Sequence, residues 1–282
     1  FPLSKQSRFT FIIQIQKIPA PTFQCIPHNQ MGGLNQRIHP VSKCEENLEV
    51  KIWRGDSSGG EFIRYNVPRE ESQTILDVVY YVQRHLDPQL SYRYACRVGM
   101  CGSCGMMVNG KPRWTCRTHV DSVLNGNNVT IEPLRNLPVI KDLACDMTDF
   151  FDKWRKAKGI FEPTKTREDD IEPISPESAK RKIVAAAIEC INCAVCYAAC
   201  DVVEKSPAYL GPAALNRAWT LANDVRDGGQ KERLQAVAGD AGCHNCHSQQ
   251  GCMTYCPNDL NPTLSIAGLK RETVAAALKG EI

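Results

Sequence analysis

The sequence of 282 residues has no hydrophobic run long enough to cross a membrane. A spanning helix needs about 20 mostly apolar residues, and the longest apolar pieces here, such as residues 9–13 and 183–188, are far shorter. Aromatic residues make up only 7% of the chain, which leaves little from which to build a base-stacking platform. The formal net charge of +3 is close to balanced. We therefore expect neither a membrane span nor a nucleic-acid-binding protein.

Acidic residues are absent from residues 1–44, which carry several prolines and the basic residues Lys5, Arg8, Lys17, Arg37 and Lys43. A basic leader without acidic residues is typical of mitochondrial transit peptides, but those are also amphipathic and rich in Ser and Arg. This leader lacks that character. We therefore favour an added arm, or translated upstream sequence, over a transit peptide, and we expect residues 1–44 to be poorly ordered.

Cysteine, in contrast, is abundant, with 15 residues. Small secreted domains use many cysteines as disulfides, but this chain is 43% hydrophobic and long enough for two modest domains with their own cores. Eleven of the cysteines fall into three tight groups, and such groups are ligands of metals or clusters more often than crosslinks. We interpret the other four as ordinary thiols: Cys25, Cys44, Cys145 and Cys243.

The second cysteine group, from Cys190 to Cys200, has the spacing C-x2-C-x2-C-x3-C. This is the run of bacterial-type ferredoxins, in which three cysteines bind one cluster and the fourth binds another. The first cluster then needs a remote cysteine followed by proline, and Cys256-Pro257 fits. The spacing predicts a [4Fe–4S] cluster bound by Cys190, Cys193, Cys196 and Cys256.

The third group repeats this spacing from Cys246 to Cys256, but Gln249 stands where the second cysteine would be. Cys200 is predicted to join Cys246 and Cys252 as ligands of this centre. Because thiolates are the preferred ligands of iron–sulfur sites, three of them predict a cluster that lacks one iron, [3Fe–4S]. The alternative is a second [4Fe–4S] cluster with water or Gln249 on the odd iron.

The first group is Cys96-x4-Cys101-x2-Cys104, followed by Cys116. The first three match the plant-type [2Fe–2S] spacing, and Cys116 would be the fourth ligand. Three glycines suit the close approach of backbone to the inorganic sulfides: Gly99, Gly102 and Gly105. The alternative is a four-cysteine zinc site, which these gaps fit poorly.

Periodicity divides the chain around these motifs. In residues 45–135, alternation and turn signals predict strands over 48–52, 62–67, 105–108, 113–118 and 129–134, and an apolar stripe predicts a helix over 74–86. Two hairpins, one helix and a cysteine loop predict a β-grasp ferredoxin domain with a [2Fe–2S] cluster. Residues 136–175 are predicted to form a bridge with a short helix over 142–158.

Residues 176–282 are predicted to be all-helical and bacterial-ferredoxin-like, with [4Fe–4S] and [3Fe–4S] clusters. The expected helices cover residues 179–188, 213–227, 231–238 and 262–279. Ser175 is the expected N-cap of the first, and Pro212 and Pro262 are expected to open two others. The fold class is therefore α+β.

Residues 48–282 resemble the iron–sulfur subunit of succinate dehydrogenase and quinol:fumarate reductase, respiratory complex II. Beyond the cysteine motifs, the resemblance rests on Lys141-Asp142-Leu143, Gly211-Pro212-Ala213-Ala214 and Asn261-Pro262. The segments 105–109 and 196–200 are similar to the bacterial fumarate reductase branch in particular.

The resemblance implies an electron-transfer subunit of an oxidoreductase of the tricarboxylic acid cycle. Electrons would pass between the FAD of a partner flavoprotein, which interconverts succinate and fumarate, and a quinone beside a membrane anchor subunit. This chain would have no catalytic residue of its own. It would lie on the cytoplasmic face of a bacterial inner membrane or, alternatively, on the matrix face of the mitochondrial one. The alternative function is the iron–sulfur subunit of a glycolate or glycerol-3-phosphate dehydrogenase, which usually lacks the [2Fe–2S] module.

The resemblance also suggests two quinone residues, His247 and Lys270, of which the lysine would stabilise negative charge or supply protons. The alternative is a histidine beside the cluster ligands and a solvated lysine. Asp201 and Lys205 depart from the family pattern, where a proline and often a tryptophan stand. These departures affect the expected quinone pocket rather than the clusters.

Overall fold

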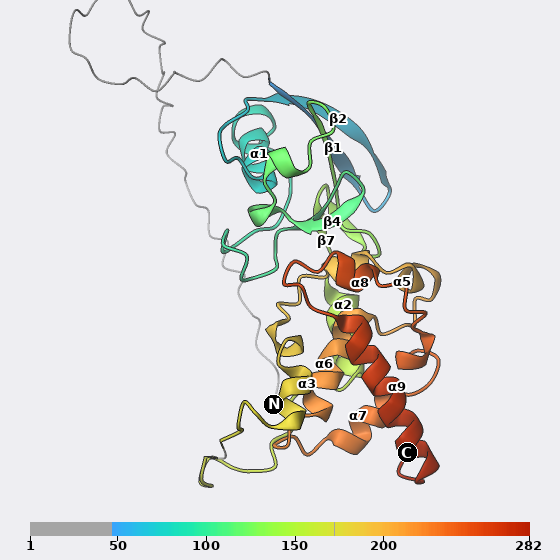
Figure 1. Cartoon of the computed structure of the whole chain (residues 1–282). Coiled ribbons are helices and arrows are strands. Elements are labelled where there is room, and N and C mark those ends of the chain that lie inside the picture. The colour runs from blue at the N-terminus through green and yellow to red at the C-terminus, as the bar shows by residue number, and fades with distance from the viewer. Residues whose placement is uncertain (1–46, 172) are drawn as a thin grey trace, which may run out of the picture. The chain divides into compact units, whose positions relative to one another are not determined.

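The computed structural model describes residues 47–171 and 173–282. The predicted arm at residues 1–44, with Cys25 and Cys44, lies outside the described residues. The described chain forms a sheet in its N-terminal part and helices in its C-terminal part (Figure 1). The expected succession of a mixed domain followed by a helical one is thereby confirmed.

The sheet has five strands in the order β2-β1-β5-β3-β4. Its strands are β1 (Leu48–Asp56), β2 (Gly59–Val67), β3 (Gly105–Val108), β4 (Lys111–Trp114) and β5 (Asn128–Glu132). The interior strand β1 pairs antiparallel with β2 and parallel with the central strand β5, which places Val50 opposite Val129 and Ile52 opposite Ile131. These four side chains are buried, so the alternation seen in the sequence is the inner face of the sheet.

One helix covers this inner face. Helix α1 (Ile75–Tyr81) continues into a wider turn over Val82–Leu86, so the helix predicted over 74–86 is confirmed with a change of winding. A capping box starts it: the Thr74 hydroxyl accepts from the Asp77 N–H, and the Asp77 carboxylate accepts from the Thr74 N–H. Ile75, Val78 and Val79 are buried in the core of the sheet domain.

The strand predicted over 113–118 is confirmed for its first two residues and is wrong for the other four. Strand β4 ends at Trp114, and a 3₁₀ turn follows over Thr115–Arg117. The backbone turns there because the Thr115 N–H and hydroxyl both donate to the Cys104 carbonyl, at 3.1 and 2.9 Å. This turn buries Cys116 beside Cys104.

The helix predicted over 142–158 begins late. Residues 139–145 form a small hairpin of β6 (Val139–Lys141) and β7 (Ala144–Cys145), and α2 covers only Thr148–Lys156. Asp142 holds the hairpin turn at φ +51°, and its carboxylate accepts from the N–H groups of Gly55 and Ser91. Long-range hydrogen bonds therefore override the local helical pattern.

The C-terminal part consists of short helices around the buried α6. The helices are α3 (Ala179–Val184), α4 (Val195–Ala198), α5 (Asp201–Lys205), α6 (Pro212–Ala222), α7 (Gln230–Val237), α8 (Gly251–Thr254) and α9 (Pro262–Leu278), with 3₁₀ turns at Ala187–Glu189 and Cys243–Asn245. Helix α9 packs against α6 where Gly268 meets the Trp219 ring; a Cβ there would lie 2.5 Å from the ring.

The expected helix starts at Pro212 and Pro262 are confirmed. The expected N-cap at Ser175 is wrong. Ser178 caps α3 by accepting from the Arg181 N–H, while the Ser175 hydroxyl accepts from the Glu177 N–H in the turn before it. The N-cap is therefore Ser178, three residues later in the sequence than predicted.

A buried ion pair holds the segment after α2 against the helices. The Arg233 guanidinium contacts the Asp227 carboxylate at 2.7 and 3.0 Å, and both side chains are fully buried. Arg233 also donates to the carbonyls of Lys158, Ile160 and Gly229. The charges are thus paired and their remaining hydrogen-bonding groups are satisfied, as a buried pair requires.

Candidate iron–sulfur sites

The first cysteine group forms a loop between α1 and β3, closed by the turn after β4. The Cys96 sulfur accepts N–H groups of Val98, Met100 and Cys101 at 3.3–3.5 Å. Burial, a hydrogen bond with the Cys104 thiol and the neighbouring Cys96 raise the pKa of Cys116 to about 12. The structure thereby brings the cysteines of this group together.

The loop has two sides. Cys104 and Cys116 are buried, whereas Cys101 is exposed, and so are the apolar side chains of Val98 and Met100, at 59% and 70%. Hydrogen bonding from the Ser103 hydroxyl and from the Cys96 backbone lowers the pKa of Cys101 to about 6. N–H and O–H donors around a sulfur favour its thiolate form, which is the ligand form.

The second group lines a small cavity inside the helical part. All four cysteines predicted for [4Fe–4S] reach it: Cys190, Cys193, Cys196 and Cys256. The rest of its wall is mostly apolar, with Ile191, Ala213 and Leu260. Asn192 and Ala194 have positive φ, at +54° and +62°, which coils the loop tightly enough to turn its thiols to one side.

The third group lines a separate cavity. Cys200, Cys246 and Cys252 reach it, together with Gln249 at the position of the missing cysteine. The Ser248 N–H points to the Cys246 sulfur at 3.5 Å, and the Thr263 hydroxyl lies 3.3 Å from the Cys252 sulfur. Gln249 itself is exposed.

The two cavities exchange cysteines. In the first run, Cys196 within α4 lines the cavity of the second group, and Cys200, two residues after α4, lines the cavity of the third group. In the second run, Cys252 lines the cavity of the third group and Cys256 lines the cavity of the second group. Each run therefore contributes to both cavities.

Burial raises the pKa values of the thiols in these cavities. The pKa of Cys193 is raised to about 12 and that of Cys196 is also raised well above its usual value, in both cases by burial first and by neighbouring thiols after it. Cluster binding would then displace protons from these thiols. Within 47–171 and 173–282, no three His, Cys, Asp or Glu side chains are grouped as ligands of a single metal ion.

The first and second groups touch through glycine. A Cβ on Gly102 would lie 2.8 Å from the Cys193 Cα and 3.0 Å from the Ile191 carbonyl oxygen. A Cβ on Gly105 would lie 3.1 Å from the Cys193 carbonyl oxygen. The sequence singled out these glycines for the approach of backbone to sulfide, but not for this contact between two cysteine loops.

The structure places both candidate quinone residues beside the third cavity. His247 lines it and is exposed. The Lys270 ammonium donates to the Cys246 carbonyl at 2.7 Å. Of the two departures from the family pattern, Asp201 begins α5, and Lys205 ends it with a 79% exposed side chain beside Glu204.

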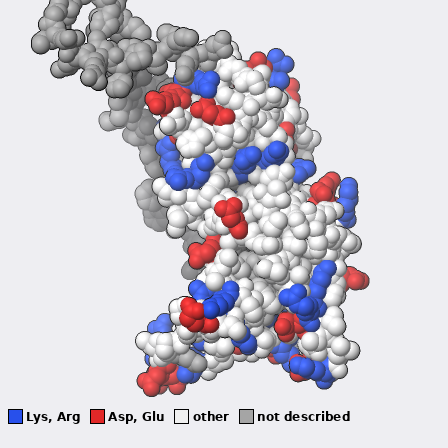
Figure 2. Space-filling model, viewed as in Figure 1, with Lys and Arg blue, Asp and Glu red and all other residues white. Residues whose placement is uncertain are grey.

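The segment of chain from Cys246 to Asn258, which forms one wall of the third cavity, carries no charged residue. No Lys, Arg, Asp or Glu occurs from Cys246 to Asn258, and Figure 2 shows an uncharged area around α8. Elsewhere on that face both signs of charge are interspersed (Figure 2). None of the described helices is long and apolar enough to span a membrane.

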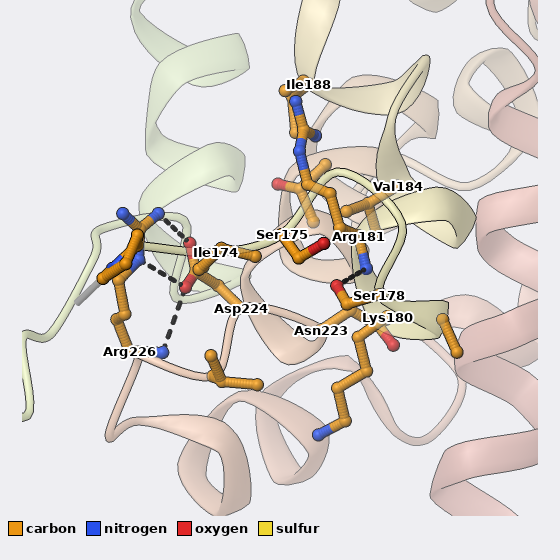
Figure 3. Close-up of a pocket in the computed structure, with 14 residues that line it drawn as sticks. Ile174, Ser175, Ser178, Lys180, Arg181, Val184, Ile188, Asn223, Asp224 and Arg226 are labelled. Atoms are coloured by element: carbon orange, nitrogen blue, oxygen red, sulfur yellow. Dashed lines mark hydrogen bonds and ion pairs between the residues drawn. The ribbon is translucent and has the colours of Figure 1, made fainter.

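A larger cavity, of about 630 Å³, lies away from the cysteines between the start of α3 and the end of α6 (Figure 3). Asp224 and Arg226 form an ion pair on one side of it, and the Ser178 cap of α3 forms another part of the wall (Figure 3). No cysteine lines this cavity, so it contributes no ligand to the three groups.

Several side chains that hold the site carry no sequence signal. The Asn136 amide donates to the carbonyls of Tyr197 and Cys200, at 3.0 and 3.1 Å, and so ties the chain after the sheet to the end of α4. Thr263, beside Cys252, looks from sequence like an ordinary first-turn residue. Cys145 and Cys243, interpreted as ordinary thiols, are buried and line neither cavity.

Comparison with known proteins agrees with this arrangement. A family model described as a 2Fe-2S iron-sulfur cluster binding domain matches residues 48–152, and one described as a 4Fe-4S dicluster domain matches residues 189–261.

Individual proteins also match over most of this chain. The fumarate reductase iron-sulfur subunit of Mycobacterium tuberculosis is 36% identical over 240 residues, covering 82% of this chain and 94% of that protein. The mitochondrial succinate dehydrogenase [ubiquinone] iron-sulfur subunit of Dictyostelium discoideum is 32% identical over 233 residues, covering 79% and 81%. Among solved structures, a chain of the Mycobacterium smegmatis Sdh1 complex in the apo form aligns with a TM-score of 0.72 and 27% identity, over 82% of this chain and 96% of that one. The chain belongs to the family of iron–sulfur, electron-transfer subunits of fumarate reductase and succinate dehydrogenase.

Proposed function

We propose that this chain relays electrons through three clusters with the ligand sets expected from its spacing. A [2Fe–2S] cluster takes Cys96, Cys101, Cys104 and Cys116, a [4Fe–4S] cluster takes Cys190, Cys193, Cys196 and Cys256, and a [3Fe–4S] cluster takes Cys200, Cys246 and Cys252. The observation that carries the proposal is the exchange of cysteines between the two cavities. Two crossed ferredoxin runs require that exchange, and ordinary core thiols do not.

The donor set of the third cavity supports a cluster with three thiolates. Gln249 is exposed at the position of the fourth ligand, and an amide is a weak ligand for iron beside thiolates. The sheet order with α1 on one face supports a β-grasp fold for residues 45–135. Residues 176–282 then form the bacterial-ferredoxin-like domain, and 136–175 form the bridge between the two.

The contacts between the groups support a relay in chain order. The clusters, when bound, accept and release single electrons, and the chain sets their spacing, their hydrogen bonds and their shielding from water. The Gly102 contact with Cys193 joins the first group to the second. Helix α4 joins the second group to the third, because Cys196 within it and Cys200 two residues after it line different cavities.

The two ends of the relay differ in chemistry, which supports different partners. The exposed apolar side of the 96–104 loop would face a flavoprotein subunit whose FAD converts succinate and fumarate. The uncharged 246–258 segment at the third cavity would face a membrane anchor subunit and a quinone, with His247 and Lys270 as the candidate quinone residues beside the cavity. The chain would then be peripheral on the cytoplasmic face of a bacterial inner membrane or the matrix face of the mitochondrial one.

The test is to purify the native complex through this chain and to measure iron, acid-labile sulfide and electron paramagnetic resonance (EPR) spectra. We expect three distinct signals, one of them from an oxidised [3Fe–4S] cluster, and succinate-dependent reduction of a quinone. A complex with two clusters, or one inactive with succinate and fumarate, would contradict the proposal.

A further inference from the structure

Thr263 stands at the wall of the third cavity with its hydroxyl directed at a predicted ligand. It is the second residue of α9, and its hydroxyl oxygen lies 3.3 Å from the Cys252 sulfur. The side chain is half-buried, and Cys252 is 7% exposed. Among the described residues, Cys252 is the hydrogen-bond partner of this hydroxyl.

The direction of this hydrogen bond follows from the chemistry of the ligand. A cysteine that binds iron is a thiolate and has no proton to give, so the hydroxyl must be the donor. The hydroxyl therefore stabilises negative charge on this sulfur.

Thr263 is not needed to start its helix. Asn261 caps α9, because its side chain accepts from the Leu264 N–H at 2.9 Å. Pro262 fills the first helical position. The hydroxyl of Thr263 can thus be removed while the cap and the helix start stay in place.

We propose that Thr263 is a positioning residue for electron transfer, whose hydroxyl donates to the Cys252 thiolate and raises the reduction potential of the third cluster. This inference rests on the proposed function. One-electron reduction adds one negative charge to the cluster and its thiolates. A fixed donor stabilises the more negative state more strongly, and hydrogen bonds to the sulfurs are among the determinants of cluster potential.

The test compares two pairs of variants that differ by the hydroxyl alone. Thr263 and Thr263→Val share a branched shape, and Thr263→Ser and Thr263→Ala share a small one. The potential of each cluster is measured in the assembled complex by redox titration followed by EPR. Removal of the hydroxyl should lower the equilibrium constant for reduction of the third cluster about tenfold, or about 59 mV for one electron. The potentials of the other two clusters should stay unchanged.

The outcomes separate this inference from the proposed function. If the wild-type complex has no third signal, the proposed function fails and this inference fails with it. If the signal is present but the two members of each pair differ by less than about twofold in the equilibrium constant for reduction of the third cluster, Thr263 does not set its potential. The proposed relay then still stands. Equal shifts of all three potentials would also overturn the role, because they would report a general structural change. If Thr263→Val prevents cluster assembly, the comparison of Thr263→Ser with Thr263→Ala still tests the role of the hydroxyl.

Discussion

Replacement of Gly102 by alanine tests the contact between the first two cysteine groups. Gly102 has φ +69°, where a non-glycine residue costs roughly 1–2 kcal/mol. The added Cβ would also lie 2.8 Å from the Cys193 Cα and 2.9 Å from its Cβ. These neighbours are a backbone atom and the Cβ fixed to it rather than a flexible side-chain end, so overpacking adds about 1–3 kcal/mol. The total is about 2–5 kcal/mol.

Gly110→Ala is the matched control. Gly110 has φ +72°, but a Cβ there meets nothing within 4 Å. The control therefore carries the backbone strain of about 1–2 kcal/mol without the close approach. The difference between the two variants isolates the contact, at about 1–3 kcal/mol.

The assay is thermal unfolding of the cluster-loaded protein, followed by the loss of visible absorbance and of helical circular dichroism. For a chain of this size, each kcal/mol lowers Tm by about 2–4 °C, so Gly102→Ala should melt well below Gly110→Ala. Electron transfer from the first cluster to the second should also slow in Gly102→Ala alone. Equal melting temperatures for the two variants would refute the contact and the spacing argument built on it.

Three further substitutions test a buried ion pair, a pair of hydrogen bonds and the missing fourth ligand of the third cavity. Arg233→Met leaves Asp227 buried without its partner and should cost about 3–5 kcal/mol in denaturant unfolding, whereas the double change with Asp227→Leu should recover part of the loss; no recovery would contradict this account of the pair. Asn136→Gly keeps the positive φ and removes two hydrogen bonds, so we expect a loss of about 1–3 kcal/mol, and an unchanged stability would show that water replaces them. Gln249→Cys should add a fourth thiolate, raise the iron content per chain and abolish the oxidised [3Fe–4S] signal; a variant that keeps the signal would place Gln249 away from the missing iron.

The sequence predicted the elements with strong periodicity and clear caps. Leu48, Val50 and Ile52 alternate because one face of β1 is buried, and Pro262 starts α9 because its missing N–H has no partner to lose. The cysteine spacing predicted which thiols come together in each of the three groups. It could do so because the ferredoxin spacing marks both the neighbouring ligands within a loop and the last cysteine of each run, which goes to the other site.

The errors arose where distant residues decide the backbone. Asp142 sits in a turn because Gly55 and Ser91 donate to its carboxylate, and neither lies within 50 residues of it in the sequence. Thr115 ends β4 early because it binds the Cys104 carbonyl. The contact of Gly102 with Cys193 and that of Thr263 with Cys252 are invisible for the same reason, since no local pattern marks a tertiary neighbour.

The exchange of Cys200 and Cys256 between the two cavities has a consequence for biogenesis. With the proposed ligand sets divided in this way, the [3Fe–4S] site lacks two ligands until the chain has been synthesised through Cys252, and the [4Fe–4S] site lacks its fourth ligand until Cys256, although the 96–116 loop can already fold. Scaffold proteins that deliver iron and sulfide would therefore load the sheet domain early and both inner sites together, late. A truncation before Cys246 would leave each inner site short of ligands, and the two inner clusters would be lost as a unit.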